Sequence, residues 1–420
     1  MKRILLIGAG KSSTCLIDYL IKTCGEFDWE LVIADGNISQ AVSKIGNSKN
    51  ARIVLLNVEN DLERNSLIYD ADIVISMLPP SLHFLVAKNC LLLRKNLLTA
   101  SYIDADIRGL ATEIEDRKLF FLCEMGLDPG IDHMSAMQII HNIQSKGGKI
   151  SSFKSHCGGL VAPESDNNPW HYKVSWNPRN IVLAGSDGAV FKKNNKIIKL
   201  EYKDLFKNCE EVEIEGTGQF AFYPNRDSLR YAEVYDLKDC PTFIRTTLRH
   251  PSFCKAWDVI VNAGLTNPED WIEIKSLAYK KWSTNTASLV SPETHYQLSF
   301  LGIFEDSPVP STAKTSADIL QDLLERRLEM KQADKDMIVM LHEFDYTLGG
   351  KQFFIKSSLI VKGEDSQRTA MAKTVGLPLG IAAKLILQNK IQLTGLHIPV
   401  LEEIYRPVLE ELALNGIHFK

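Results

Sequence analysis

The sequence predicts an α/β protein in which a doubly wound parallel sheet is followed by a second, mixed α/β domain with a helical insertion. Three observations carry this prediction. Strand-like apolar runs alternate with helical patterns over the first 123 residues, and the first run leads directly into Gly8 and Gly10. After Cys123 the strands are separated by turns rich in Gly, Asn and Pro, and a mainly helical stretch interrupts them. Such segregated patterns are typical of two differently built domains.

Length and composition agree with a globular protein of two or three domains. The chain has 420 residues, of which 45% are hydrophobic and 24% charged. Its net charge is −4, from 48 basic and 52 acidic residues, so no basic field is available to attract nucleic acid. No apolar stretch approaches the length of a membrane span, and the eight cysteines are scattered without a CxxC pair. We therefore expect a cytoplasmic protein with reduced thiols, no metal site, and neither nucleic acid nor membrane as a partner.

Six strand-like runs, with helical patterns between them, define the first domain. The runs are nearly continuous in apolar residues, as in strands that helices cover on both faces. The strands are expected at residues 4–7, 30–34, 53–58, 73–78, 97–100 and 119–123, with the clearest helices at 82–93 and 106–117. A doubly wound sheet built this way binds its ligand at the carboxyl ends of the strands.

The loop after the first strand has the features of a dinucleotide site. Gly8 allows the tight turn out of the strand, and Gly10 allows a pyrophosphate to approach the backbone. The N–H groups of the following helix then hold the anion. The third position of the fingerprint is Ser13 in place of glycine, which gives a bulkier contact between helix and strand. Small glycine loops also occur without a ligand, but here the strand, the helix and a later acidic residue all stand where the motif needs them.

Asp35, at the end of the second strand, favours NAD over NADP as the cofactor. An acidic side chain at this position accepts hydrogen bonds from the adenosine ribose and repels a 2′-phosphate. The alternative is a solvated aspartate in the turn that it forms with the next two residues. The cofactor, NAD or NADP, is expected to contact the glycine loop and the ends of the second, fourth and fifth strands. The expected cofactor residues are Gly8, Ala9, Gly10, Lys11, Ser12, Ser13, Asp35, Ser76, Leu78, Pro79 and Ser101.

The rest of the chain predicts the mixed domain and its insertion. A helix opens after Asp128-Pro129-Gly130 and runs to about residue 145. Strands are expected at residues 150–155, 181–182, 197–200, 212–214, 337–343 and 352–361, and final helices near 371–387 and 400–415 end at the surface or return to the first domain. The expected domains are 1–127, then 128–241 together with 331–399, a helical insertion at 242–330, and a C-terminal helix at 400–420.

Two segments past the fifth and sixth strands carry candidate proton-transfer groups. Ser101 and Tyr102 follow the fifth strand, at the crevice expected to hold the nicotinamide. Asp128 follows the sixth strand, where a carboxylate is able to bind an ammonium group or to accept and donate a proton. Each has a structural alternative: Tyr102 as an aromatic residue that caps a strand end, and Asp128 as the N-cap of the following helix.

Two further segments offer a thiol and guanidinium groups. Cys157 is followed by two glycines, which allow the backbone to approach a ligand or simply make a turn. Arg226, Arg245 and Arg249 are expected around loops and are suited to grip the carboxylates of a substrate with paired hydrogen bonds. The alternatives are a small buried cysteine and ordinary surface ion pairs.

Taken together, these segments resemble saccharopine dehydrogenase of the L-glutamate-forming type, also called saccharopine reductase, over nearly the whole chain. The motifs that carry the resemblance are GAGK at 8–11, SY at 101–102, GLDPGIDH at 126–133, CGGLVAPE at 157–164, YPNRDS at 223–228 and KTVGLPLGIAAKLIL at 373–387. The resemblance implies a variant Rossmann domain, an α/β domain that binds saccharopine and forms a homodimer, and a helical insertion.

The same resemblance implies a reaction and residue roles. Members of the family join 2-aminoadipate 6-semialdehyde to the amino group of L-glutamate as an imine and reduce it by hydride transfer, or oxidise saccharopine in reverse, in lysine metabolism. It places Tyr102, Asp128 and Cys157 at the proton-transfer positions, and it makes Arg226 the expected carboxylate clamp. The substrate residues that it implies are Ser101, Tyr102, Leu127, Asp128, Arg226, Arg245 and Thr246.

Two departures from the family pattern and two other functions stay open at this point. Fungal members usually carry an arginine after the second strand and use NADP, whereas this chain has Asp35-Gly36. His156 stands where an aromatic residue usually precedes the cysteine. One alternative function is another imine-reducing enzyme of the superfamily, such as carboxynorspermidine dehydrogenase, which needs fewer carboxylate clamps. The other is a non-catalytic NAD-binding redox sensor, which has no need of three proton-transfer groups.

Overall fold

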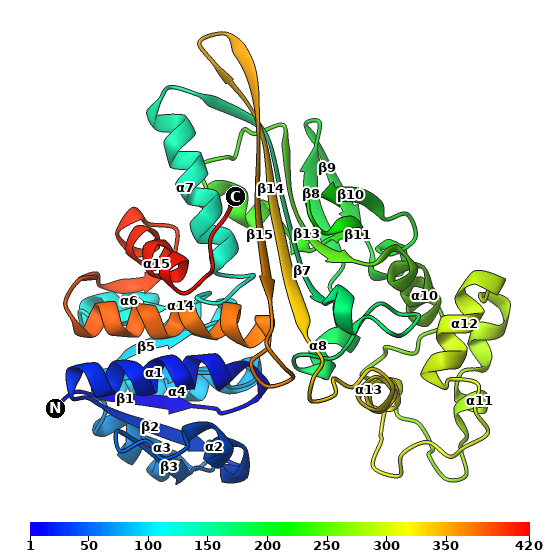
Figure 1. The fold of residues 1–420 in the computed structure, drawn as a ribbon, viewed down its shortest axis with the longest axis horizontal. Coiled ribbons are helices and arrows are strands. Elements are labelled where there is room, and N and C mark those ends of the chain that lie inside the picture. Colours follow the sequence, from blue (N-terminus) through cyan, green and yellow to red (C-terminus); the bar gives the residue numbers. More distant parts are fainter. The chain divides into compact units, whose positions relative to one another are not determined.

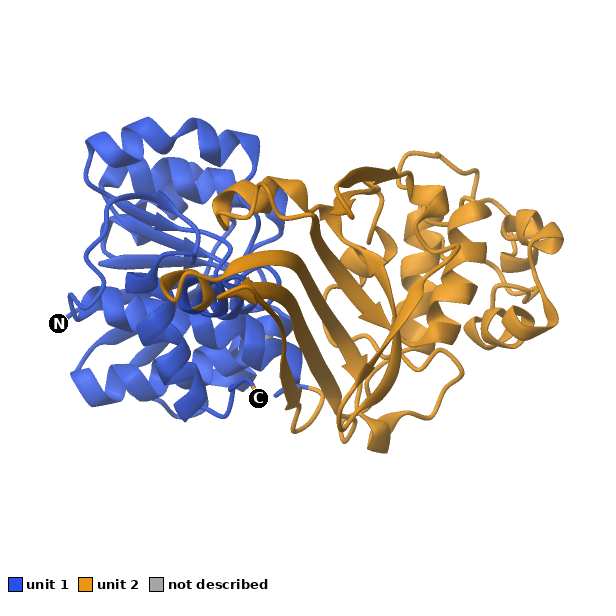
Figure 2. Cartoon of the chain, turned by 90° about the horizontal axis from the view of Figure 1, so that it is seen from above, with its two compact units in different colours: residues 1–142, 367–419 blue, residues 143–366, 420 orange. Residues whose placement is uncertain are grey.

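The computed structural model describes residues 1–420, except the side chain of residue 40, and forms two compact units. Unit 1 comprises residues 1–142 and 367–419, and unit 2 comprises residues 143–366 with Lys420 (Figure 2). Lys420 belongs to unit 2 because its backbone N–H and C=O bond Ser358, at 2.8 and 3.0 Å.

Unit 1 is built on a sheet of seven parallel strands in the order β16-β6-β5-β4-β1-β2-β3. Its strands are β1 (Arg3–Ile7), β2 (Glu30–Asp35), β3 (Ala51–Leu55), β4 (Ile73–Ser76), β5 (Asn96–Thr99), β6 (Phe120–Leu122) and β16 (Gly395–His397). The predicted doubly wound parallel sheet is therefore confirmed. The seventh strand, β16, was not predicted, because Leu396 is its one large apolar residue, between Gly395 and His397, and a single residue shows no apolar run.

Helices lie on both faces of this sheet. The helices of unit 1 are α1 (Thr14–Phe27), α2 (Ile38–Ile45), α3 (Asp61–Tyr69), α4 (His83–Leu93), α5 (Ala105–Gly109), α6 (Ala111–Asp116), α14 (Ala370–Leu387) and α15 (Glu402–Leu414), with the short helices η1 (Lys11–Ser13) and η2 (Pro80–Leu82). Helix α7 (Ile131–Ser145) leads from unit 1 into unit 2, and α15 packs on α14. Alternate strand residues such as Leu5, Ile7 and Val32 pack in one core with Ile68 of α3 and Val86 of α4. On the other face α14 contacts β4 and β5 and lies beside α1 (Figure 1).

Helix α14 corrects two expectations. Its 18 residues have a mean hydropathy of 1.5, so by length and composition it is able to cross a membrane, contrary to our reading that no stretch approaches that length. However, 83% of it is buried inside the protein, as in a core helix. It packs so closely on α1 that a Cβ atom on Gly376 would lie 2.9 Å from the Cβ atom of Leu16. This packing joins residues 367–419 to unit 1, whereas the sequence analysis assigned residues 331–399 to the second domain.

Unit 2 contains a mixed sheet of nine strands. These are β7 (Lys149–Val161), β8 (Ala189–Lys193), β9 (Lys196–Leu200), β10 (Glu210–Ile214), β11 (Gly218–Pro224), β12 (Arg226–Asp227), β13 (Thr242–Arg249), β14 (Asp336–Leu348) and β15 (Lys351–Lys362). The main order is β10-β11-β13-β7-β14-β15, in which β13 and β7 run parallel and the other neighbours antiparallel. The predicted mixed domain is confirmed.

The helices of unit 2 surround a second core. They are α8 (Pro178–Val182), α9 (Leu229–Val234), α10 (Pro251–Asn262), α11 (Tyr279–Trp282), α12 (Pro292–Leu301) and α13 (Ser316–Arg327), with η3 (Pro163–Ser165), η4 (Tyr202–Asp204) and η5 (Thr284–Ser288). Trp170, Trp257 and Leu320 are fully buried in that core.

Two local predictions for unit 2 are wrong. Residues 181–182, expected in a strand, end α8, because the Asn177 side chain caps a helix that begins with Pro178. Residues 242–249, expected to begin the helical insertion, form β13, which is paired on both sides by β11 and β7. Long-range pairing of this kind overrides local pattern.

Candidate active site

The glycine loop of unit 1 leaves room for a ligand beside its backbone. It follows the carboxyl end of β1, where the Gly8 N–H donates to the Ala34 carbonyl at 2.9 Å. A Cβ atom on Gly10 would meet no atom within 4 Å, so packing within the protein does not require glycine there. The open space fits the predicted approach of a pyrophosphate to residues 8–13, at the start of η1 and α1.

Lys44, which the sequence analysis did not identify, ties this loop to α2. Its Nζ donates to the carbonyl oxygens of Ala9 and Gly10 at 2.7 and 2.6 Å and lies 3.2 Å from Ser13 Oγ. Ser13 Oγ itself donates to the Gly10 carbonyl at 2.8 Å. The serine that replaces the third glycine therefore joins the loop's own hydrogen bonds. Burial lowers the pKa of Lys44 to about 8.

Asp35 connects the end of β2 to the same loop. Its Oδ2 accepts a hydrogen bond from the Ala9 N–H at 2.6 Å, and its Oδ1 accepts one from the Asn37 N–H at 2.7 Å. The second bond is the turn contact that we gave as the structural alternative. The first bond sets the carboxylate against the glycine loop, where a ribose acceptor is expected.

A histidine joins the ends of β4 and β5. His83 Nδ1 lies 2.8 Å from Ser76 Oγ, and His83 Nε2 lies 2.7 Å from Ser101 Oγ. Burial lowers the pKa of His83 to about 4, so the ring is neutral at pH 7. Both serines were predicted as cofactor residues from the sequence, whereas the histidine between them was not. Leu78 and Pro79, the other predicted cofactor residues, follow β4 and are half-buried and exposed, respectively.

Tyr102 and Asp128 lie together within unit 1. The Tyr102 hydroxyl donates to Asp128 Oδ1 at 3.3 Å. Asp128 and Leu127 stand in a tight loop, where Gly130 has φ +144° and a Cβ atom on it would lie 2.1 Å from the Gly126 carbonyl oxygen. Because α7 begins at Ile131, Asp128 lies outside the N-cap position that we gave as its alternative. A phenol hydrogen-bonded to a carboxylate is able to pass a proton in either direction.

In unit 2, the strand register sets Cys157 and Arg245 on one face of the sheet. Cys157 of β7 is opposite Thr247 of β13, and alternation puts Arg245 on the same face. Thr246 points to the other face, where its Oγ1 lies 2.7 Å from His156 Nδ1. The structure therefore separates the Thr246 hydroxyl from the two predicted groups. The glycines after Cys157 lie inside β7 and make no turn.

The three arginines have different surroundings, and Arg245 and Arg249 lie in β13 rather than around loops as predicted. Arg245 is only 3% exposed, and its guanidinium lies 4.4 Å from the centre of the Tyr231 ring. Arg226 on β12 has 58% of its side chain exposed and pairs with Asp187 at 3.3 Å, which is the surface ion pair given as the alternative. Arg249 is buried over Tyr172, 5.2 Å from the ring centre.

His156 is also bonded to a carboxylate that the sequence analysis missed. Its Nε2 lies 3.3 Å from Glu343 Oε2, and Lys356 Nζ lies 3.3 Å from Glu343 Oε1. The hydrogen bond to His156 is the main cause that lowers the pKa of Glu343 to about 2. Burial lowers the pKa of His156. No signal in the sequence links these residues, because Glu343 stands on β14, far along the chain.

The comparisons with known proteins cover the whole chain. The family description "Saccharopine dehydrogenase NADP binding domain" matches residues 4–122, and "Saccharopine dehydrogenase C-terminal domain" matches residues 126–417. The chain is 30% identical to saccharopine dehydrogenase [NADP(+), L-glutamate-forming] of Schizosaccharomyces pombe, over 100% of this chain and 98% of that protein. It is 33% identical to the mitochondrial alpha-aminoadipic semialdehyde synthase of Bos taurus, of which it spans 47%, about half the length.

A solved structure has the same fold. The apo form of saccharopine dehydrogenase (L-Glu forming) from Saccharomyces cerevisiae superimposes with a TM-score of 0.89 at 30% identity. The match covers 100% of this chain and 99% of that one. Sequence, family descriptions and fold agree from the first strand to the last helix, and we conclude that the chain belongs to the saccharopine dehydrogenase family.

Proposed function

We propose that the protein interconverts saccharopine with L-glutamate and 2-aminoadipate 6-semialdehyde, using a nicotinamide dinucleotide, in lysine metabolism. The observation that carries the proposal is the Tyr102–Asp128 pair at 3.3 Å, in the unit that also holds the glycine loop. The names of the relatives, which are L-glutamate-forming saccharopine dehydrogenases and alpha-aminoadipic semialdehyde synthases, support it.

The reaction balances with one water and one hydride. In the oxidative direction, the C–H bond beside the secondary amine of saccharopine loses a hydride and the amine loses a proton, which leaves an imine. Water adds to the imine, and the C–N bond of the resulting carbinolamine breaks to release L-glutamate and the semialdehyde. The bound dinucleotide supplies or accepts the hydride at its nicotinamide. The protein therefore has to accept the amine proton, position the water and protonate the leaving nitrogen.

Each unit contributes residues proposed for part of this reaction. In unit 1, Asp128 with Tyr102 is the proposed pair for proton transfer to and from nitrogen and the carbinolamine. In unit 2, Cys157 is a third candidate, and the buried Arg245 is the proposed carboxylate clamp. Arg226 is proposed as a second, more solvated clamp, whose current partner Asp187 would have to yield.

We propose from the position of Asp35 that the protein prefers NAD to NADP. Relatives that are named for NADP(+) support NADP use, and the carboxylate beside the glycine loop favours NAD. A 2′-phosphate carries about −1.5 to −2 charges, so one carboxylate about 4 Å away would oppose it by about 2 kcal/mol even in bulk water. Asp35→Ser should then raise kcat/KM for NADP relative to NAD about tenfold or more. A wild-type protein that already prefers NADP would contradict the role of Asp35.

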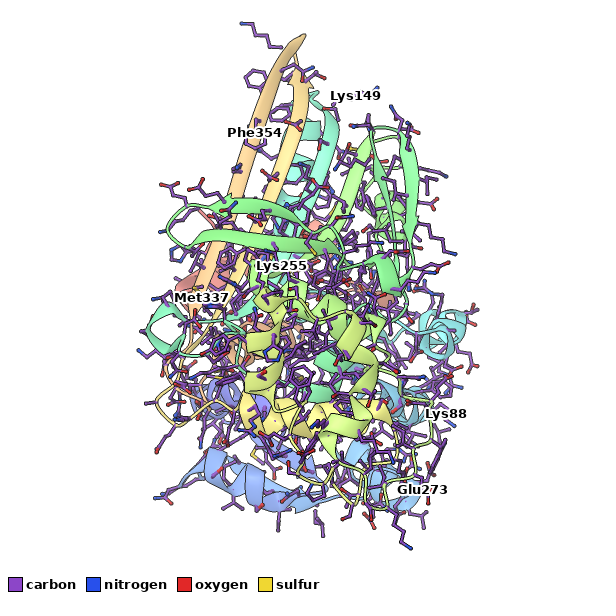
Figure 3. All side chains as sticks on the ribbon, turned by 90° about the vertical axis from the view of Figure 1, so that its right-hand side faces the viewer. Lys88, Lys149, Lys255, Glu273, Met337 and Phe354 are labelled. Atoms are coloured by element: carbon purple, nitrogen blue, oxygen red, sulfur yellow. The ribbon has the colours of Figure 1, made fainter. Side chains whose placement is uncertain are left out.

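A homodimer and a cytoplasmic location complete the proposal. The strand β15 is the last in its sheet order and carries Phe353 and Phe354, which are 41% and 52% exposed. Figure 3 labels Phe354 on this strand. An edge with exposed aromatic side chains supports pairing with a second copy of this chain. The scattered cysteines support a reducing compartment. Light scattering of the purified protein would test the dimer, and Phe354→Lys should shift it toward monomer.

The decisive assay follows the reduced dinucleotide while saccharopine is consumed. Stoichiometric L-glutamate must appear, and release of lysine and 2-oxoglutarate would refute the proposed regiochemistry. Tyr102→Phe and Asp128→Asn should each lower kcat by about 100-fold. Carboxynorspermidine as the better substrate would favour the other imine-reducing function, and dinucleotide binding without any turnover would favour a redox sensor.

A further inference from the structure

A cluster of three ionisable side chains is buried in unit 1 without a part in the proposed chemistry. Glu124, Asp132 and His133 are 1%, 1% and 0% exposed. Removing charged groups from water is unfavourable unless they are paired and hydrogen-bonded, so a buried cluster of this kind needs an explanation. None of the three was singled out as a site residue from the sequence, although two of them belong to the motif GLDPGIDH.

The three side chains form a connected row. His133 Nε2 lies 3.0 Å from Glu124 Oε2, and His133 Nδ1 lies 3.6 Å from Asp132 Oδ2. Both ring nitrogens therefore face a carboxylate. Among the residues that the structure describes, no group of His, Cys, Asp and Glu is arranged to hold a metal ion, so the row is not a metal centre.

The two ends of the row hold backbone groups beside the proposed proton-transfer pair. At one end, Glu124 Oε1 accepts a hydrogen bond from the Ile103 N–H at 3.2 Å, directly after Tyr102. The Glu124 N–H also donates to the Ser101 carbonyl at 3.0 Å, directly before Tyr102. Glu124 thus bonds the chain on both sides of the tyrosine.

At the other end, Asp132 holds the loop that carries Asp128. Its Oδ1 accepts a hydrogen bond from the Gly130 N–H at 2.6 Å, two residues after Asp128. The tyrosine and the aspartate thus belong to two separate loops, and the row Glu124–His133–Asp132 connects these loops through the interior.

We propose that Glu124, His133 and Asp132 are positioning residues that hold the Tyr102 hydroxyl and the Asp128 carboxylate at proton-transfer distance. This inference rests on the proposed function of that pair. A donor and an acceptor on separate loops lose their alignment when either loop shifts, and a displacement of 1 Å lowers a rate by about 100-fold. Supporting side chains locked by their own hydrogen bonds prevent such a shift.

The test compares two substitutions of the histidine. His133→Gln keeps a hydrogen-bond donor toward Glu124, whereas His133→Leu removes both polar contacts. We expect kcat for saccharopine oxidation to fall by about 100-fold in His133→Leu and to recover to within about tenfold of wild type in His133→Gln. The dissociation constant of the dinucleotide and the KM for saccharopine should stay within about twofold of wild type.

A matched control comes from the same helix. His141 also lies on α7 and bonds the hydroxyl of Tyr405 through its Nδ1 at 2.9 Å. His141→Leu removes a histidine hydrogen bond from α7 without touching the row, so its kcat should equal that of wild type. An equal loss of kcat in His141→Leu would mean that any disturbance of α7 suffices, and it would overturn the positioning role.

Other outcomes also decide the inference. Wild-type kcat in a folded His133→Leu protein would overturn it, as would parallel losses of kcat, KM and dinucleotide affinity in both histidine variants. If His133→Leu does not fold, Glu124→Gln takes its place, because it keeps the size and an acceptor oxygen and removes the charge. If the wild-type protein does not turn over saccharopine, the proposed function fails separately. In that case crystal structures of the variants decide whether the row positions the pair, since a positioning role requires the Tyr102–Asp128 distance to lengthen beyond 3.5 Å.

Discussion

Replacing Lys44 by methionine tests how the glycine loop of unit 1 is held. The ammonium group donates to the carbonyl oxygens of Ala9 and Gly10 from a partly buried position. Methionine keeps most of the apolar stem and removes the charge. The variant should therefore loosen the loop, weaken dinucleotide binding and change how stability depends on pH.

The size of the pH effect follows from the pKa of Lys44. Burial lowers this pKa from 10.5 to about 8. A difference of 2.5 corresponds to about 3.4 kcal/mol at about 1.36 kcal/mol for each pH unit. Because water screens a side chain that is only half-buried, we expect about 2 kcal/mol.

The sign of the effect follows from proton binding. Between pH 8 and pH 10.5 the unfolded chain keeps the lysine proton while the folded chain releases it. Stability rises with pH wherever the unfolded state binds more protons. The free energy of unfolding of the wild type, relative to Lys44→Met, should therefore increase by about 2 kcal/mol across this window.

Urea denaturation of both proteins at pH 7.5, 9 and 10.5 measures this difference, in which the effects of all other lysines cancel. Lys88→Met, at an exposed position on α4 (Figure 3), is the matched control and should give a flat difference. A flat difference for Lys44→Met as well would refute the reasoning, because it would mean that the buried ammonium keeps its ordinary pKa.

Two further predictions concern packing and acid stability. Gly376→Val should lower the free energy of unfolding by about 1–3 kcal/mol, because its Cβ atom would crowd Leu16, whereas Gly109→Ala, where a Cβ atom meets nothing within 4 Å, should be neutral; thermal melting measures both. Glu343→Gln should flatten the acid limb of the stability curve. The carboxylate bonded to His156 has its pKa lowered from 4.5 to about 2, so its contribution is complete above pH 4.5 and is lost as the pH falls toward 2; urea denaturation between pH 3 and pH 6 measures this loss.

The parts of the fold that were predictable from sequence are those that local pattern determines. Continuous apolar runs identified six of the seven strands of the parallel sheet, and Gly8 and Gly10 identified the loop after the first of them. The strand β13 was assigned to a helical region, because its pairing with β7 and β11 depends on residues far away in the chain. For the same reason, the return of α14 to unit 1 was only one of two alternatives for the final helices.

The candidate site also divides into residues that local sequence pattern identifies and residues that only long-range contacts identify. Asp35, Tyr102 and Asp128 follow strand ends, and strand ends are where a parallel sheet gathers ligand-binding groups. Lys44 and His83 act through hydrogen bonds across space, and nothing in their local sequence marks them. That Thr246 faces away from Cys157 followed only from the register of β13 against β7, which the sequence did not specify.

The late return of the chain to unit 1 has a consequence for synthesis. When only residues 1–142 have left the ribosome, α1 already exists, but the helix that covers Leu16 is encoded more than two hundred codons downstream. The nascent protein therefore exposes the apolar side of α1 until residues 370–387 have been made, a condition that invites chaperone binding. For the same reason, expression of the dinucleotide-binding segment alone should give inclusion bodies, whereas fusing residues 367–419 to it through a short linker should restore solubility.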